Sequence, residues 1–107
     1  MTITAEASIS HQSTAAVDEL MDELFSWWRS AIKRRDYSAA AVLKDAESTV
    51  ESLRGSYSPE ELIPLCHEIF SELTEQCDLV EEASRKLHGE IAALIGTLAK
   101  RHGIELA

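Results

Sequence analysis

The side chains of this chain that are most able to do chemistry are four histidines and two cysteines. Metal sites inside helical bundles commonly use a Glu followed three residues later by a His, because that spacing places both on one helix face. No histidine here has an acidic residue three positions before it, and no two histidines are four residues apart, the spacing that suits zinc on one helix. The histidines are His11, His67, His88 and His102, preceded at that distance by Ser8, Pro64, Arg85 and Ala99. We therefore predict no metal site.

The two cysteines, Cys66 and Cys77, are eleven residues apart on what we expect to be one helix. That spacing corresponds to about 16 Å, which is beyond the reach of a disulfide bond. Cys66 and His67 could supply two metal ligands, but neighbouring helix positions point about 100° apart. We expect reduced, partly buried thiols and an exposed His67.

Other kinds of catalytic site also lack their residues. The chain has no glycine-rich loop of the kind that holds phosphate groups. Small all-helical chorismate mutases bind a dianion with Arg and Lys inside a bundle, whereas most basic residues here gather near expected helix ends. The central part of the last helical segment offers only Arg85 and Lys86. We predict that the protein is not an enzyme and needs no cofactor.

Composition limits the classes of partner. A chain of 107 residues suits one domain, and 45% of its residues are hydrophobic. Its formal net charge of -9 opposes general binding to nucleic acid or to an anionic membrane, since phosphate contacts need clustered Lys and Arg. The N-terminus has no signal-peptide pattern, and no apolar run is long enough to cross a bilayer. We expect a cytoplasmic location, with neither nucleic acid nor membrane as a partner.

The helical pattern begins after a short tail. Residues 1–12 show no sustained apolar period and are expected to be a flexible tail, and residues 13–107 a single helical domain. Ser13 or Thr14 can cap a first helix that ends near Arg35. A second helix is expected from Asp36 or Ser38 to a stop at Gly55.

The third helix is predicted to begin at Ser58, with Pro59 at its first position and Glu61 completing a capping box. Pro64 predicts a bend or a short separate turn near Leu62. From Leu65 the apolar pattern runs on to a stop at Gly103. Asp78 and Glu81 resemble a further capping box inside this run, but no Gly or Pro accompanies them, so we expect one continuous helix.

The predicted fold is all-α, an antiparallel helical hairpin or bundle of three helices with a long C-terminal helix. A helix from Leu65 to Arg101 would span roughly 55 Å, whereas each upstream helix would span about 25 to 30 Å. Part of its apolar stripe would then need cover from another chain. Gly89 and Gly96 add a face of small residues that would let helices approach closely, at a cost of about 1 kcal/mol each in helix propensity.

Charge and aromatic residues are unevenly distributed. Residues 55–83 hold eight acidic groups and no Lys or Arg, while residues 29–35 hold four basic groups. The acidic stretch either steers a basic partner or is a solvated helix face. Trp27 and Trp28 are neighbours on one helix and must point in different directions. One is expected in the core, and Trp28 either at an interface or at the core edge.

The arrangement of the helices resembles the FliT and FlgN group of flagellar export chaperones over residues 17–100. The resemblance is carried by Arg34-Arg35-Asp36-Tyr37, by Pro59 before a long final helix, and by Asp78-Leu79-Val80 and Leu94-Ile95-Gly96 within it. It implies a cytoplasmic chaperone that holds an amphipathic terminal helix of a flagellar or type III secreted subunit. Such a chaperone presents this client to a component of the export apparatus.

A chaperone of this kind needs an exposed apolar channel between helices. We expect one wall from the second helix and one from the third, although each residue is equally an ordinary core candidate. The predicted partner-binding residues are Trp28, Leu43, Val50, Leu53, Val80, Leu87 and Leu94. The alternative is a homodimeric helical-bundle scaffold or regulatory protein without a client, and a homodimer is expected on either hypothesis.

Overall fold

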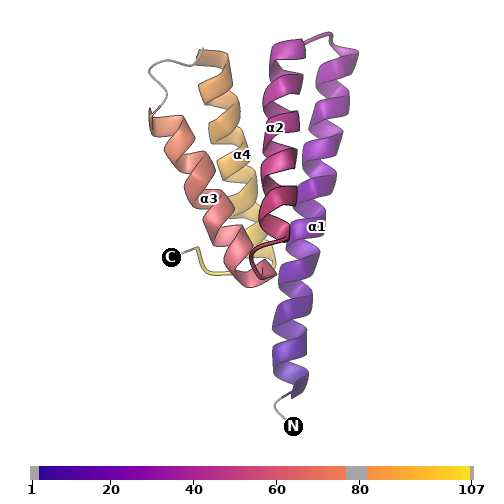
Figure 1. Cartoon of the computed structure of the whole chain (residues 1–107), viewed down its shortest axis with the longest axis vertical. Helices are drawn as coiled ribbons and strands as arrows, with labels where there is room; N and C mark the ends of the chain where they lie inside the picture. Colours follow the sequence, from indigo (N-terminus) through magenta and orange to yellow (C-terminus); the bar gives the residue numbers. More distant parts are fainter. Residues whose placement is uncertain (1–2, 77–81, 107) are drawn as a thin grey trace.

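The computed structural model describes the backbone of residues 3–76 and 82–106 and the side chains of residues 14–75 and 82–106. Within these ranges every regular element is a helix and there is no strand, which confirms the all-α class. The helices are α1 (Ile3–Lys33), α2 (Tyr37–Arg54), α3 (Pro59–Gln76) and α4 (Glu82–Arg101). Figure 1 shows two antiparallel hairpins, α1 with α2 and α3 with α4, that pack together as a bundle measuring 52 × 28 × 23 Å.

Helix α1 begins earlier than the sequence pattern indicated. It starts at Ile3, so it includes residues 3–12, which we expected to be a tail, as well as the proposed caps Ser13 and Thr14. No Gly or Pro occurs between Ile3 and Asp36, so nothing in this stretch breaks a helix once it has formed. The first turns of α1 extend past the ends of the other helices (Figure 1).

The predicted boundaries around α2 and α3 are confirmed. The Asp36 carboxylate accepts a hydrogen bond from the Ala39 N–H at 3.1 Å, which caps α2. Gly55 follows the last residue of α2, and Pro59 is the first residue of α3. The Ser58 hydroxyl donates to the Glu61 carboxylate at 2.8 Å. Helix α3 continues as one element through Pro64, so the expected separate turn near Leu62 is absent.

The prediction of one continuous C-terminal helix is wrong. Helix α3 ends at Gln76, α4 begins at Glu82, and the two lie side by side in opposite directions (Figure 1). The proposed inner capping box, Asp78 with Glu81, lies outside the described residues. Doubling back allows α3 and α4 to bury their apolar faces against each other and against the first hairpin, which a straight rod could not do.

The core draws on all four helices. Its largest fully buried side chains are Leu20, Leu24, Leu62, Ile63, Ile91, Ile95, Leu98, Val17, Val50 and Cys66. Because the second hairpin covers the apolar stripe that a rod would have exposed, the length of the C-terminal segment no longer argues for a partner chain. Any partner surface must be found on the outside of the bundle.

Candidate functional site

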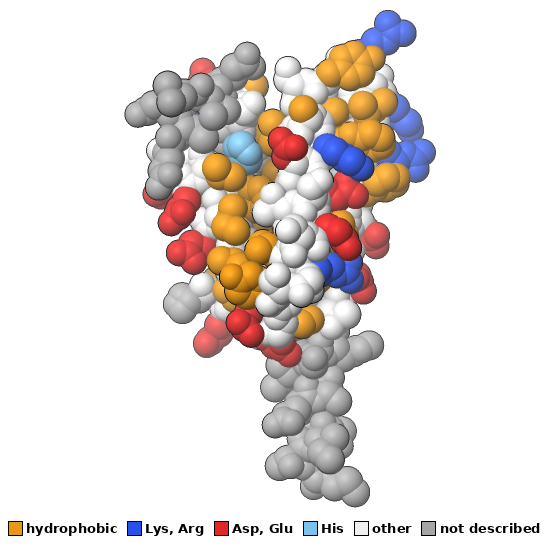
Figure 2. All heavy atoms as spheres, in the orientation of Figure 1, with side chains coloured by type: hydrophobic (Ala, Val, Ile, Leu, Met, Phe, Trp, Pro, Cys, Tyr) orange, Lys and Arg blue, Asp and Glu red, His pale blue; other side chains and the backbone are white. Residues whose placement is uncertain are grey.

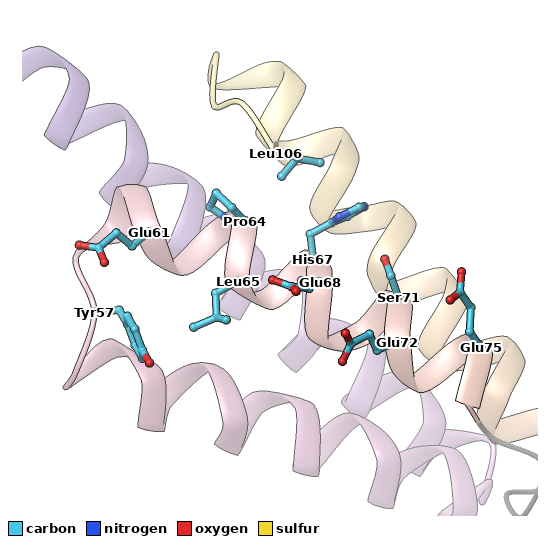
Figure 3. Close-up of a pocket in the computed structure, with 10 residues that line it drawn as sticks. All are labelled: Tyr57, Glu61, Pro64, Leu65, His67, Glu68, Ser71, Glu72, Glu75 and Leu106. Carbon is cyan, nitrogen blue, oxygen red and sulfur yellow. The ribbon is translucent and has the colours of Figure 1, made fainter.

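The outer face of α3 carries a groove of about 580 Å³. Figure 3 shows its lining, which comes from α3, from the turn before it and from the segment after α4. The lining residues, which define the α3 groove, are Tyr57, Glu61, Pro64, Leu65, His67, Glu68, Ser71, Glu72, Glu75 and Leu106.

Helical periodicity explains why these residues share one face. The buried side of α3 carries Leu62, Ile63, Cys66 and Phe70, each at most 2% exposed. The positions between them turn outward with a spacing of four, three, four and three residues, which keeps them in one stripe along a helix. That stripe consists of Glu61, Leu65, Glu68, Glu72 and Glu75. Leu65 is therefore an apolar position within a row of carboxylates.

Two further apolar side chains reach the groove from distant parts of the sequence. Tyr57, in the turn between α2 and α3, is 42% exposed. Leu106 is held at the other end of the chain, where the Ile104 N–H donates to the Ala99 carbonyl at 2.8 Å and folds the segment back. Together with Pro64 and Leu65 they supply the apolar lining of the groove, which we call its floor. We call the carboxylates that line it its rim: Glu61, Glu68, Glu72 and Glu75.

The four carboxylates of the rim have no basic partner among the described residues. None of the ion pairs found there includes Glu61, Glu68, Glu72 or Glu75, and no Lys or Arg lines the groove. On the face shown in Figure 2, acidic side chains gather over α3 and no Lys or Arg accompanies them. Uncompensated charge of one sign beside a low-dielectric wall concentrates the electric field, so the groove attracts cationic groups.

The partner-binding residues that were predicted from sequence and that the structure describes do not form an open channel. Leu43 and Val50 are 2% and 0% exposed, so in this arrangement neither offers surface to a partner. Three others are partly buried and pack against the core: Leu53, Leu87 and Leu94. Val80 lies outside the described residues. The structure does bring Leu43 and Leu87 together, at a hollow of about 220 Å³ between α1, α2 and α4.

Trp27 and Trp28 are both half-buried and both pack against the core. Trp28 also stacks with Phe25, with 5.9 Å between ring centroids, and Lys44 lies 5.4 Å from its ring centroid. Sequence reasoning missed Tyr57, Leu65 and Leu106. A signal for Leu65 was present in the regular spacing of the acidic residues around it, whereas nothing local links Tyr57 to Leu106.

The reactive groups of the described residues are arranged for packing. Cys66 is fully buried, and desolvation raises the pKa of its thiol to about 11, which keeps it protonated and unreactive. Burial also lowers the pKa of His88, whose ring stacks on Phe70 with 6.2 Å between centroids. Within the part of the chain that the structure describes, no group of three His, Cys, Asp or Glu side chains could hold a metal ion. Among those same residues, no helix is long and apolar enough to span a membrane.

Comparison with known proteins adds no family. The chain has no match among protein-family models, among curated proteins or among solved structures. The functional argument therefore depends on the α3 groove, which combines an apolar floor with four carboxylates and has no Lys or Arg among its lining residues. Such a surface can bind a cationic, amphipathic ligand through contact and charge, without any bond being made or broken.

Proposed function

We propose that this protein is a binding module that holds a basic amphipathic segment of another protein in the α3 groove. The observation that carries the proposal is a row of carboxylates around Leu65 that form no ion pair with the described residues: Glu61, Glu68, Glu72 and Glu75. An apolar residue of the partner would rest on the floor formed by Leu65 and its neighbours. Lys or Arg side chains on either side of that anchor would meet the rim.

As in other helix-in-groove complexes, apolar contacts and charged contacts contribute differently to binding. Burial of the apolar anchor supplies affinity at about 25 cal/mol per Å² of apolar surface removed from water, less the cost of ordering the segment. The carboxylates speed encounter and reject acidic segments, because like charges brought together cost several kcal/mol. The net charge of -9 acts in the same direction as the rim. Binding should therefore weaken as salt is added.

A more specific form of the proposal is a cytoplasmic chaperone of the flagellar or type III export class, whose client segment is the terminal helix of an exported subunit. The support for this form is the resemblance over residues 17–100, less the long final helix, which is two helices, α3 and α4, in the structure. The client would lie on the outside of α3 rather than between the second and third helices, since Leu43 and Val50 are buried. A chaperone that only binds a helix and so prevents its aggregation needs no reactive side chain.

The binding test uses two fluorescently labelled peptides of equal length and identical apolar residues, one with Lys and Arg on its polar face and one with Glu and Asp. Anisotropy titrations against the whole chain should show binding of the basic peptide and little or none of the acidic one. Raising the salt from 50 to 500 mM should weaken the binding. Equal affinity for both peptides would contradict an electrostatic groove.

A matched pair of variants on one helix locates the site. Leu65→Ala removes an apolar floor residue, whereas Leu73→Ala removes a leucine that is 37% exposed and does not line the groove. Leu65→Ala should weaken binding of the basic peptide about tenfold or more, in the range for an interface anchor, and Leu73→Ala should leave it unchanged. For the chaperone form, terminal helices of exported subunits should bind more tightly than unrelated basic helices of the same charge.

A further inference from the structure

Among the described residues, a second surface with exposed apolar side chains and unpaired charges lies at the end of the first hairpin. Of the five large hydrophobic side chains that are exposed in the described part of the chain, three lie here: Phe25 at 45%, Ile32 at 37% and Tyr37 at 64%. They stand among four cations at the end of α1. We call this surface the basic tip, comprising Phe25, Arg29, Ile32, Lys33, Arg34, Arg35 and Tyr37. Figure 2 shows basic and hydrophobic side chains together at this end.

The cations of the basic tip have no acidic partner in the described structure. The ion pairs there involve Lys44, Arg54, Arg101 and His102, and none includes a cation of the tip. Arg34 donates to the Ser30 hydroxyl at 3.3 Å, and the Arg29 guanidinium lies 5.9 Å from the centroid of the Phe25 ring. Exposed apolar surface beside unpaired charge is typical of an interaction surface.

The tip and the α3 groove carry opposite charges, and each combines four charged side chains with apolar ones. One offers four cations around exposed Phe25, Ile32 and Tyr37, and the other offers four carboxylates around an apolar floor. Four of the five exposed large hydrophobic side chains belong to these two surfaces, since Tyr57 lines the groove. Each copy of the chain therefore carries both a basic surface and an acidic surface that is complementary to it.

We propose that the basic tip of one copy docks into the α3 groove of a second copy, head to tail. This inference rests on the proposed function in one respect, because it uses the same groove. The spacing of the charges supports it. Arg29 and Lys33 are four residues apart on α1, and Glu68 and Glu72 are four apart on α3. Each pair is separated by about 6 Å along its helix, so two cations can meet two carboxylates when the helices lie alongside each other.

The geometry makes this contact different from a symmetric dimer. Tip and groove are separate surfaces, so each docked copy keeps one free tip or one free groove, and association continues unless a ring closes. A basic segment of another protein would compete for the groove and break the assembly. The net charge of -9 on each copy opposes approach, but screening over about 8 Å at physiological salt leaves the local contacts to decide, and the association is weak.

A second copy fits the tip better than a polyanion does. Nucleic acid would leave the aliphatic Ile32 without a stacking partner. Nucleic acid and an anionic membrane also carry their charge well beyond the tip, where it meets the acidic surface of this chain, whereas the carboxylates of a single groove are local. A short DNA duplex and anionic phospholipid vesicles serve as probes of these alternatives.

The decisive test is a charge swap on the whole chain. One variant carries Arg29→Glu with Lys33→Glu, and the other carries Glu68→Lys with Glu72→Lys. Sedimentation equilibrium of the wild type should show an average mass that rises with protein concentration. Each variant alone should associate at least tenfold more weakly, because like charges now face each other. An equimolar mixture should regain association, since the unchanged tip of the second variant meets the unchanged groove of the first.

Peptide binding separates this inference from the proposed function. The Arg29→Glu, Lys33→Glu variant should still bind the basic peptide, because its groove is intact, whereas the Glu68→Lys, Glu72→Lys variant should lose both activities. If Glu68→Lys with Glu72→Lys fails to fold by circular dichroism, Glu68→Gln with Glu72→Gln takes its place, and Phe25→Ala with Tyr37→Ala tests the apolar half of the contact.

Three results would overturn the self-docking inference while leaving groove binding standing. The wild type could stay monomeric at every concentration while still binding the basic peptide. The mixture of charge variants could fail to associate more than either variant alone. Finally, a monomeric wild type could bind DNA or anionic vesicles in a manner abolished by Arg29→Glu with Lys33→Glu, which would assign the tip to a polyanion.

Discussion

The Oε2 atom of Glu19 on α1 lies 2.7 Å from Nε2 of His102, directly after α4. The other carboxylate oxygen of Glu19 accepts a hydrogen bond from Arg101. This pair of contacts ties the end of the second hairpin to the first, close to the place where Leu106 reaches the α3 groove. The hydrogen bond with His102 is the largest cause of the lowered pKa of Glu19. Desolvation opposes it, and the charge of Arg101 and its hydrogen bond add to the lowering.

The Glu19 contacts predict an acid-dependent loss of stability. Because the folded state lowers the pKa of Glu19, its carboxylate stabilises the fold above the ordinary pKa of Glu, about 4.3, and this contribution is lost as the pH falls through the folded value. Glu19→Gln should therefore have a lower urea midpoint than wild type at pH 7, and the difference should disappear on acidification. Glu23→Gln, an exposed residue on the same helix, is the control and should match wild type throughout. A pH-independent difference for Glu19→Gln would contradict this account.

Two glycines in α4 predict stabilising substitutions. A Cβ at Gly89 would come no closer than 3.5 Å to Thr74, and one at Gly96 would lie 3.9 Å from His67, so alanine fits at both positions. The expected close approach of helices at these glycines is therefore not what they provide. Gly89→Ala and Gly96→Ala should each stabilise the fold by up to about 1 kcal/mol through helix propensity. Thermal unfolding should show this as a midpoint raised by about 4 to 8 °C per kcal/mol.

Gly103→Ala should have the opposite effect. Gly103 has a φ of +68°, in the left-handed region that ends α4, and a side chain there is strained although space is open around it. We expect a loss of about 1 kcal/mol and a lower midpoint in the same melting experiment. If all three alanine variants moved the midpoint in one direction, backbone conformation would not be what distinguishes these glycines.

The boundaries that could be predicted from sequence are those set by local chemistry. Asp36, Gly55, Pro59 and Gly103 act on backbone groups within a few residues, so their effect is visible in the sequence. The reversal between α3 and α4 depends instead on contacts between remote residues, such as Phe70 with His88. No local pattern reports that both helices bury more apolar surface by folding back.

The candidate site divides in the same way. The outward row of Glu61, Leu65, Glu68, Glu72 and Glu75 follows from helical spacing, and the acidic character of this region was evident from sequence. The groove also needs Tyr57 and Leu106, which line it together only because α4 returns the chain to the beginning of α3. The predicted channel is not seen among the described residues for a related reason, since Leu43 and Val50, assigned to one wall, are buried in the core of the bundle.

Leu43 tests whether the second helix serves the core or a partner. Leu43 is 2% exposed and packs in the core, so Leu43→Ala should destabilise the fold by about 2 to 5 kcal/mol. Leu73→Ala, at a position 37% exposed on α3, should cost no more than about 0.5 kcal/mol. Urea unfolding monitored by circular dichroism measures both. If the Leu43→Ala chain keeps wild-type stability but no longer binds the basic peptide, the binding surface includes α2, as the sequence-based prediction had it.

The buried thiol of Cys66 predicts resistance to modification. Its side chain is 0% exposed, and desolvation raises the pKa of the thiol to about 11. At pH 8 this leaves about two-hundredfold less thiolate than a free cysteine with a pKa near 8.5 would have, before the steric protection of the core is counted. In a Cys77→Ser variant, the single remaining thiol should react with Ellman's reagent far more slowly than the same thiol in 8 M urea.

Adding urea below the unfolding midpoint should speed the reaction in proportion to the unfolded fraction, because the thiol becomes accessible when the bundle opens. A native rate equal to that of a free cysteine would show that Cys66 lies at an accessible surface, and the packing of α3 against α1 and α4 described here would then be wrong.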